Sequence, residues 1–317
     1  MNTEPETRFR KTRIAPTPSG FLHIGNILSF CITAALARRT GAKILLRIDD
    51  LDQQRTDQRF IDDIFTTLHF LEIPWDEGPR NTKDFIQNYS QVLRLERYQQ
   101  VLDSLGEKGQ IFPCSCTRTQ LAAFAEKGYP ETCLHRAPDR TQPVNWRLNT
   151  SEQRLLHMKT VPGNRVVSQL PPAMRHFVVR KKDGYPSYQL ASVMDDLYFG
   201  IDLIVRGADL LDSTAAQLYL AAVLGADAFS DICFLHHPLL MKNEVEKLSK
   251  SAGDTSVKYL REQGQKPAAI FRMIGEKIGI NQPIQNGVEL GEWALSLLER
   301  NDNQTENTPF AGFRIFS

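Results

Sequence analysis

The sequence predicts an α/β protein with a doubly wound, largely parallel sheet. An apolar run at residues 43–48 is bounded by a turn and by acidic residues, which is typical of a buried parallel strand. The patterns of the first part of the chain follow the order strand, loop, helix, strand, helix, which is the βαβ signature of a doubly wound sheet.

The elements of the first hundred residues follow from spacing and end signals. Gly41 follows the first predicted helix, and Arg38 and Arg39 lie in its last turn, where cations complement the helix dipole. Apolar residues at helical spacing predict two more helices. The expected elements are a strand at 13–15, a loop at 16–26, a helix at 27–39, the strand at 43–48 and helices over 60–71 and 89–102.

The middle of the chain changes character between residues 106 and 170. Pro, Gly, Cys and polar residues are frequent there and periodicity is weak, so we expect an insertion. Regular signals return afterwards, and Lys182-Asp183-Gly184 predicts a hairpin turn. A strand at 201–207, a helix at 214–224 and a short, mostly helical tail complete the expected order.

Composition limits the function classes. The chain has 317 residues and a net charge of +1, so it has no global field that would attract nucleic acid, and such binding has to be local. No apolar run reaches the roughly 20 residues that span a bilayer, and the start lacks the apolar core of a secretory signal. We therefore expect a cytoplasmic protein without a membrane partner. An odd count of five cysteines argues against a disulfide framework, and Cys31 and Cys233 are interpreted as core residues.

The stretch PTPSGFLHIGN, residues 16–26, precedes the first predicted helix. A helix N-terminus has unpaired N–H groups and a partial positive charge, so it suits a phosphate. His23 can donate to phosphate oxygens, and Gly25 allows close approach to the backbone. The alternative for this stretch is a plain capping turn.

A second stretch, EKLSKSAGD at residues 246–254, combines cations with hydroxyls. Lys247 and Lys250, with Ser249 and Ser251, suit a triphosphate whose charge has to be neutralised as pyrophosphate leaves. The alternative is a solvated, lysine-rich loop.

Together, HIGN and KLSKS resemble the two signatures of class I aminoacyl-tRNA synthetases. The stretches RIAPTPSGFLHIGN, LLRIDDLD, YPSYQLASVMDDLYFGIDLIVRGADLLDST and LHHPLL look like the glutamyl branch, and the resemblance covers residues 13–254. It implies that ATP, which carries Mg²⁺, is bound by His23, Gly25, Asn26 and Lys250. It also implies that the catalytic residues are His23, Gly25, Lys247 and Lys250. It also implies attack of a carboxylate on the α-phosphorus, helped mainly by positioning and electrostatics.

The resemblance also implies an amino-acid site. A glutamate side chain calls for a guanidinium, and Arg206 follows the apolar strand LIV, where it can pair bidentately with a carboxylate. The family usually has Glu where this chain has Asp49, which puts fine substrate preference in question. The implied glutamate-binding residues are Arg13, Thr17, Asp49, Tyr188 and Arg206.

The cysteines of the insertion form a third motif. Cys114, Cys116 and Cys133 suit tetrahedral zinc but leave one ligand open. Tyr129 matches the Tyr-x₃-Cys spacing of the short glutamyl-queuosine enzymes, and His135 matches the Cys-x-His spacing of some full-length glutamyl enzymes. We expect Tyr129 as the fourth ligand, with His135 as the alternative. Reduced thiols without a metal are the remaining interpretation.

The length after the second signature indicates the branch. Only 66 residues follow Ser251, whereas full-length glutamyl enzymes continue into an anticodon-binding body, so the chain resembles the glutamyl-queuosine tRNA(Asp) synthetases. This implies a monomer that transfers glutamate to queuosine in the anticodon arm of tRNA(Asp). The alternatives are a shortened glutamyl-tRNA synthetase and a non-catalytic paralogue. The expected division is a Rossmann-like catalytic domain at 8–105 and 171–250, a zinc-bearing insertion of acceptor-binding type at 106–170 and a helical tail with a flexible end at 251–317.

Overall fold

The computed structural model describes residues 8–122, 124, 128–135, 143–161, 163–240 and 256–302. The described residues pack into two compact units. The first unit comprises Met1–Gln91, Asp202–Ala208 and Phe234–Ser317, and the second comprises Val92–Ile201 and Asp209–Cys233. The domain division expected from the sequence stays a prediction. The two units are defined by packing alone and are not the predicted domains. No helix in the described ranges is both long enough and apolar enough to cross a bilayer.

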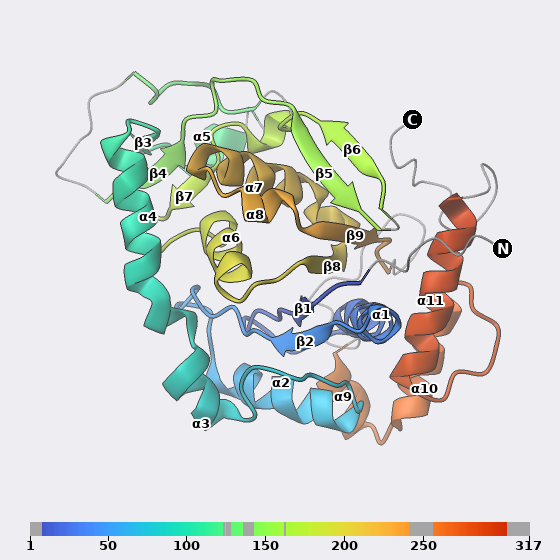
Figure 1. Ribbon diagram of the computed structural model, residues 1–317. Coiled ribbons are helices and arrows are strands. Elements are labelled where there is room, and N and C mark those ends of the chain that lie inside the picture. The colour runs from blue at the N-terminus through green and yellow to red at the C-terminus, as the bar shows by residue number, and fades with distance from the viewer. Residues whose placement is uncertain are drawn as a thin grey trace. The chain divides into compact units, whose positions relative to one another are not determined.

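Parallel strands form the centre of the first unit (Figure 1). Strand β1 pairs with β2 in a register that places Lys11 opposite Lys43. Strand β8 lies beside β1, where the Asp202 N–H donates to the Lys11 carbonyl at 3.0 Å, and β9 neighbours β8. The expectation of an α/β fold with parallel strands is therefore confirmed. The strands are β1 (Lys11–Ile14), β2 (Lys43–Leu46), β8 (Leu203–Gly207) and β9 (Cys233–His237).

Helix α1 (Ile24–Thr40) packs on these strands and begins three residues earlier than the sequence pattern predicts. It starts early because His23 acts as the N-cap and Asn26 completes a capping box, so the first turn lies inside the predicted loop. Gly41 ends the helix in the left-handed conformation, with φ of 78°.

The helices near the C-terminus pack within the first unit (Figure 1). Helix α11 crosses α1 so closely that a Cβ at Gly291 would lie 2.2 Å from the Cys31 carbonyl oxygen, so this crossing requires glycine. Helix α9 contacts α2, and Arg261 pairs there with the buried Asp63 at 2.6 Å. The other helices of this unit are α2 (Gln58–Phe70), α3 (Thr82–Asp84), the π-helical turn η1 (Phe85–Tyr89), α9 (Val257–Glu262), α10 (Pro267–Lys277) and α11 (Gly287–Asp302).

The second unit contains a three-stranded antiparallel sheet and a β-hairpin. The sheet has the order β3-β4-β7, and β5 pairs with β6. The predicted turn at Lys182-Asp183-Gly184 is present, with Gly184 at φ of 92° and an isolated bridge between Arg180 and Pro186. The strands are β3 (Ile111–Cys114), β4 (Asn145–Leu148), β5 (Leu156–Thr160), β6 (Arg165–Ser168) and β7 (Val178–Arg180).

A buried polar cluster joins two helices of the second unit. Arg94 donates to both carboxylate oxygens of Asp195 at 2.8 Å, and the Tyr98 hydroxyl donates to the same carboxylate at 2.7 Å. All three side chains are buried, so the cluster fixes α4 against α6. The helices are η2 (Gln91–Arg94), α4 (Leu95–Glu107), α5 (Arg118–Ala122), η3 (Pro172–Met174), α6 (Tyr188–Tyr198), η4 (Ala208–Leu210), α7 (Leu211–Leu224) and α8 (Asp227–Ser230).

Candidate functional site

His23 lies at the mouth of α1 and is held there by its own helix. Its Nδ1 accepts a hydrogen bond from the Gly25 N–H at 3.1 Å, and its backbone N–H donates to Asn26 Oδ1 at 3.1 Å. Because Nδ1 accepts, the neutral ring carries its proton on Nε2, which is therefore a donor. The capping turn expected as the alternative is thus present, and it also fixes the orientation of the histidine.

Gly25 allows the imidazole to lie against the first turn. A Cβ at this position would lie 2.9 Å from both Nδ1 and Cε1 of the His23 ring, closer than ordinary contacts allow. A larger residue would therefore displace the ring. Asn26, which the resemblance assigns to ATP, uses its side-chain oxygen to cap the helix.

A segment distant in sequence returns to this place. Ser256 forms an isolated antiparallel bridge with His23, and the Val257 N–H donates to the Leu22 carbonyl at 2.8 Å. Ser256 is also the N-cap of α9. Ser256, the first described residue after the second signature, therefore lies beside His23. Lys247 and Lys250 themselves lie outside the described residues.

A cluster of two buried arginines and one partly buried histidine lies on three strands of the first unit. Arg13 on β1 is 5% exposed and donates from Nη1 to the Val205 carbonyl at 3.2 Å. Arg206 on β8 is 3% exposed, and its guanidinium lies 5.1 Å from the centre of the Phe234 ring. His236 on β9 stacks on the same ring, with centroids 6.1 Å apart and planes at 13°.

Burial and the neighbouring charges together set the protonation of His236. Burial is the main cause that lowers the pKa of His236, and the positive charges of Arg206 and Arg13 help to lower it to about 3. His236 is therefore neutral while two buried guanidinium groups stay charged. Such an arrangement can bind an anion, and it suits a carboxylate best, since arginine matches carboxylate geometry.

Asp49 has a partner that the sequence did not indicate. Arg47, itself buried, donates from Nε and Nη2 to the two oxygens of Asp49 at 2.7 and 3.1 Å. The Asp49 N–H donates to the Pro16 carbonyl at 2.9 Å, which ties it to the loop that carries the half-buried Thr17. The Asp49 carboxylate would therefore bind Arg47 and a substrate ammonium group at the same time.

Tyr188 belongs to the other unit. It is the first residue of α6, and its side chain is 42% exposed. Its role in an amino-acid site stays a prediction.

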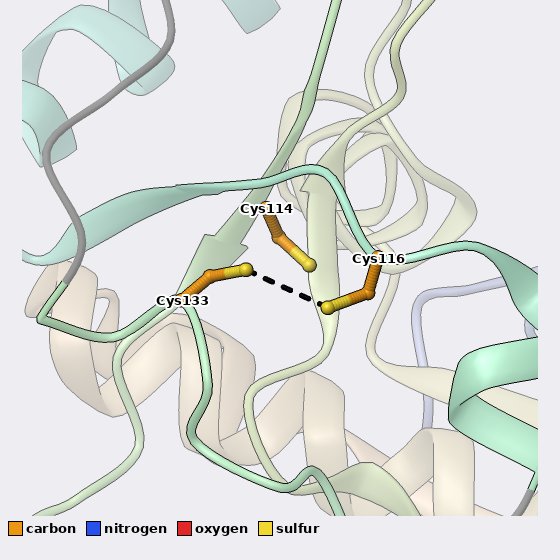
Figure 2. Close-up of side chains that lie close together, drawn as sticks. All are labelled: Cys114, Cys116 and Cys133. Carbon is orange, nitrogen blue, oxygen red and sulfur yellow. Dashed lines mark hydrogen bonds between the residues drawn. The ribbon is translucent and has the colours of Figure 1, made fainter.

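Three cysteine side chains of the second unit point toward one another (Figure 2). Their sulfur atoms lie within 4.8 Å of one another, and those of Cys116 and Cys133 are 3.5 Å apart. A disulfide would need about 2.05 Å, whereas two thiolates on one tetrahedral zinc lie about 3.8 Å apart. The Tyr129 hydroxyl donates to Cys114 Sγ at 3.1 Å, while His135 is exposed and outside this group.

The electrostatics of the cluster also suit a metal. Burial alone would raise the pKa of Cys133, but hydrogen bonds from Tyr129, the Ser115 backbone and Cys116 lower it to about 7. Burial raises the pKa of Cys116 to about 11. Three converging thiols, one of them with a lowered pKa, and a phenol beside them fit a zinc ion, since zinc binds the deprotonated sulfur.

Comparisons with known proteins agree with one another. The family model "tRNA synthetases class I (E and Q), catalytic domain" matches residues 10–286. The chain is 32% identical over 296 residues to glutamate–tRNA ligase 2 of Syntrophus aciditrophicus. The alignment covers 88% of this chain but only 59% of that relative. It is also 32% identical to the glutamyl-Q tRNA(Asp) synthetases of Symbiobacterium thermophilum and Geobacter sulfurreducens. The first alignment covers 86% of this chain and 87% of the relative, and the second covers 94% of this chain and 95% of the relative.

A solved structure shares the fold. The glutamate-tRNA synthetase from Elizabethkingia anophelis superposes with a TM-score of 0.70 at 22% identity, over 90% of this chain and 65% of that one.

Proposed function

The chain belongs to the class I tRNA synthetases of the E and Q type, a family of ligases, and from this we propose that it activates glutamate with ATP and transfers it to the queuosine base of tRNA(Asp). One observation carries the choice of amino acid. Two buried guanidinium groups, Arg13 and Arg206, lie on neighbouring strands, with the neutral His236 beside them. This cluster suits the carboxylates of an acidic amino acid.

Activation begins with attack of a glutamate carboxylate oxygen on the α-phosphorus of ATP. The new bond gives glutamyl-adenylate, and the bond to pyrophosphate breaks. His23 Nε2 donates to the phosphates at the mouth of α1, Gly25 keeps the approach open, and Lys247 and Lys250 neutralise the leaving pyrophosphate. Mg²⁺ accompanies ATP, as it does in this class of synthetase. An acceptor hydroxyl then displaces AMP and forms the ester.

Arg206 and Arg13 hold the carboxylates of the substrate while Asp49, Thr17 and Tyr188 complete the site around its amino group. Asp49 reaches that amino group while it remains bonded to Arg47. The Asp49 side chain is shorter than that of the glutamate usual in the family. We therefore expect the amino group to lie nearer the Asp49 backbone, or a water to fill the gap.

The acceptor is assigned from the relatives. The glutamyl-Q tRNA(Asp) synthetases align over 82–95% of their own length, whereas the glutamate–tRNA ligases align over 59–64% of theirs. The relatives named glutamyl-Q tRNA(Asp) synthetase support queuosine in the anticodon arm as the proposed acceptor. A shortened glutamyl-tRNA synthetase is the second candidate, because one relative named glutamate–tRNA ligase is also 32% identical.

Zinc has a structural role in the proposal. The ligands would be Cys114, Cys116, Cys133 and Tyr129. The ion would strengthen the link between segments that a small hydrophobic cluster holds together.

The test is exchange of ³²P-labelled pyrophosphate into ATP with each amino acid in turn, with and without tRNA. We expect glutamate to support exchange, and aspartate and glutamine to support little, because the cluster selects a carboxylate at the right distance. Exchange with another amino acid would overturn the substrate assignment. Absence of exchange with every amino acid and tRNA would leave the non-catalytic paralogue.

A further inference from the structure

A cavity of about 250 Å³ opens in the second unit, and none of the residues assigned above to ATP, glutamate or zinc line it. Its walls come from the segment before β5, the segment after β6, the short helix η3 and α7. Sites for drug-sized ligands measure about 300–1,000 Å³. The cavity therefore suits a single heterocyclic ring better than a whole nucleoside triphosphate.

Arg154 presents a fixed planar group to this cavity. Its guanidinium lies 5.9 Å from the centre of the Tyr219 ring, and Nη2 contacts Glu152 Oε2 at 2.5 Å. The Tyr219 hydroxyl donates to the Glu152 carbonyl at 2.8 Å, which holds the ring in place. Arg154 Nε is buried and has no hydrogen-bond partner among the described residues.

The rest of the lining offers two kinds of polar contact. Gln153 and Gln169 each carry an amide that both donates and accepts, as the edges of nucleobases do. Arg175 lines the cavity as well, with a side chain that is 43% exposed and paired to Glu131. A guanidinium has five donors, so Arg175 can bind a phosphate oxygen while keeping this pair.

We infer that this cavity binds one unstacked base of an RNA strand, with the base plane on the Arg154 guanidinium, its edge on the glutamine amides and its phosphate on Arg175. Proteins read single-stranded RNA in this way, by stacking splayed bases on aromatic or arginine planes and by bonding their edges. The inference rests on the proposed function for its partner, a tRNA. It adds a second place where the protein holds RNA, apart from the base that receives glutamate.

The test compares equilibrium binding of unfractionated tRNA at fixed salt by wild type, Arg154→Ala, Arg154→Lys and Gln169→Ala. Loss of a stacked base weakens binding by about 5- to 100-fold. We expect this loss for both Arg154 variants, since lysine keeps the charge but lacks the plane, and a smaller loss for Gln169→Ala. Arg272→Ala, which removes an equal charge from an exposed position on α10, should change the Kd less than about twofold.

Each other outcome decides against the inference. Full affinity in Arg154→Lys with loss in Arg154→Ala would mean that the contact is to a phosphate alone. Wild-type affinity in all three cavity variants, or absence of tRNA binding by the wild type, would mean that no base binds here. Pyrophosphate exchange by the wild type is measured in parallel, so failure of glutamate activation is recognised separately from failure of RNA binding. Thermal unfolding of each variant identifies loss of fold, and Gln169→Ala tests the site without the Glu152 and Tyr219 contacts.

Discussion

His23 uses its two ring nitrogens for different tasks. Nδ1 accepts from the Gly25 N–H and caps α1, which leaves Nε2 as the donor for a ligand. The sequence presented these tasks as alternatives, a cap or a phosphate site. The structure shows the cap, and the cap fixes the ring orientation, so it sets where Nε2 would meet the phosphate that we propose.

Replacing His23 with Asn separates the two tasks. Asparagine is a good N-cap, so the free energy of unfolding should change by less than about 1 kcal/mol. The donor Nε2 is lost, and the rate of glutamate activation should fall about 10²–10³-fold, as it does when one donor to a developing charge is removed. Pyrophosphate exchange and urea unfolding measure the two effects. An active His23→Asn enzyme would mean that Nε2 does not contact the phosphates.

Asn26→Ala is the matched control. It removes the acceptor for the His23 N–H, so we expect the protein to lose about 0.5–2 kcal/mol of stability with little change in the KM for ATP. The opposite result, unchanged stability with a large rise in that KM, would support the direct contact with ATP that the family resemblance implies.

Arg206 tests the carboxylate site. Removing the partner of a buried carboxylate costs about 3–5 kcal/mol, so Arg206→Ala should lower kcat/KM for glutamate by about 10²–10³-fold or more, with the KM for ATP little changed. Arg206→Lys keeps the charge without the fork and should recover only part of this loss. Normal glutamate activation by Arg206→Ala would mean that the cluster of Arg13, Arg206 and His236 does not bind the substrate.

Sequence alone indicated some residues of the site and missed others for definable reasons. Arg13 and Arg206 were expected, and the structure buries both on neighbouring strands. Arg47 was missed, although it lies two residues before Asp49, a spacing that puts both side chains on one side of an extended chain. His236 belongs to the motif LHHPLL, but the sequence indicated no role for it, because its neutrality depends on burial in the fold and on charges from other strands.

The loop that holds the cysteines is an element whose structure we expect to depend on a metal. Purified protein should contain about one zinc per chain, and Cys116→Ser should release it. Tyr129→Phe should weaken zinc retention, while His135→Ala should not, because only Tyr129 reaches the sulfur atoms in the structure. Competition with a chromogenic chelator measures this. Loss of zinc in His135→Ala but not in Tyr129→Phe would reverse the ligand assignment, and zinc-free protein prepared without chelators would remove the site.

The packing of α4 against α6 depends on the buried ion pair between Arg94 and Asp195. Arg94→Met would leave the carboxylate of Asp195 buried without its guanidinium, so the free energy of unfolding should fall by about 3–5 kcal/mol. Arg97→Met, a substitution at an exposed position on the same helix, should cost less than about 1 kcal/mol. Urea unfolding of both variants tests this, and equal losses would show that the pair is not special.

The predictability of each element followed its pattern. Strand β2 was recognised by its continuous apolar run, and helices α2 and α7 by apolar residues at helical spacing. Strands β3 to β6 are as short as β2 but lie in a region of weak periodicity, so the sequence did not indicate them. The early start of α1 was missed because a histidine cap is not among the usual N-cap residues.

At the scale of the whole molecule, a chain with a net charge of +1 has to bind RNA through local groups. Contacts to phosphates release counterions, so tRNA affinity should still fall with rising salt, with a slope set by the number of phosphates held. Specificity then depends on which base or ribose meets the glutamyl-adenylate.

The central claim concerns the atom of tRNA that receives glutamate, and one measurement decides it directly. tRNA(Asp) that contains queuosine is charged with ¹⁴C-labelled glutamate, digested with ribonuclease, and the label is located among the fragments. We predict label on the anticodon fragment, none on the 3′-terminal adenosine, and no charging of the same tRNA without queuosine. Label on the terminal adenosine, with none on the anticodon fragment, would contradict the account and identify a shortened glutamyl-tRNA synthetase.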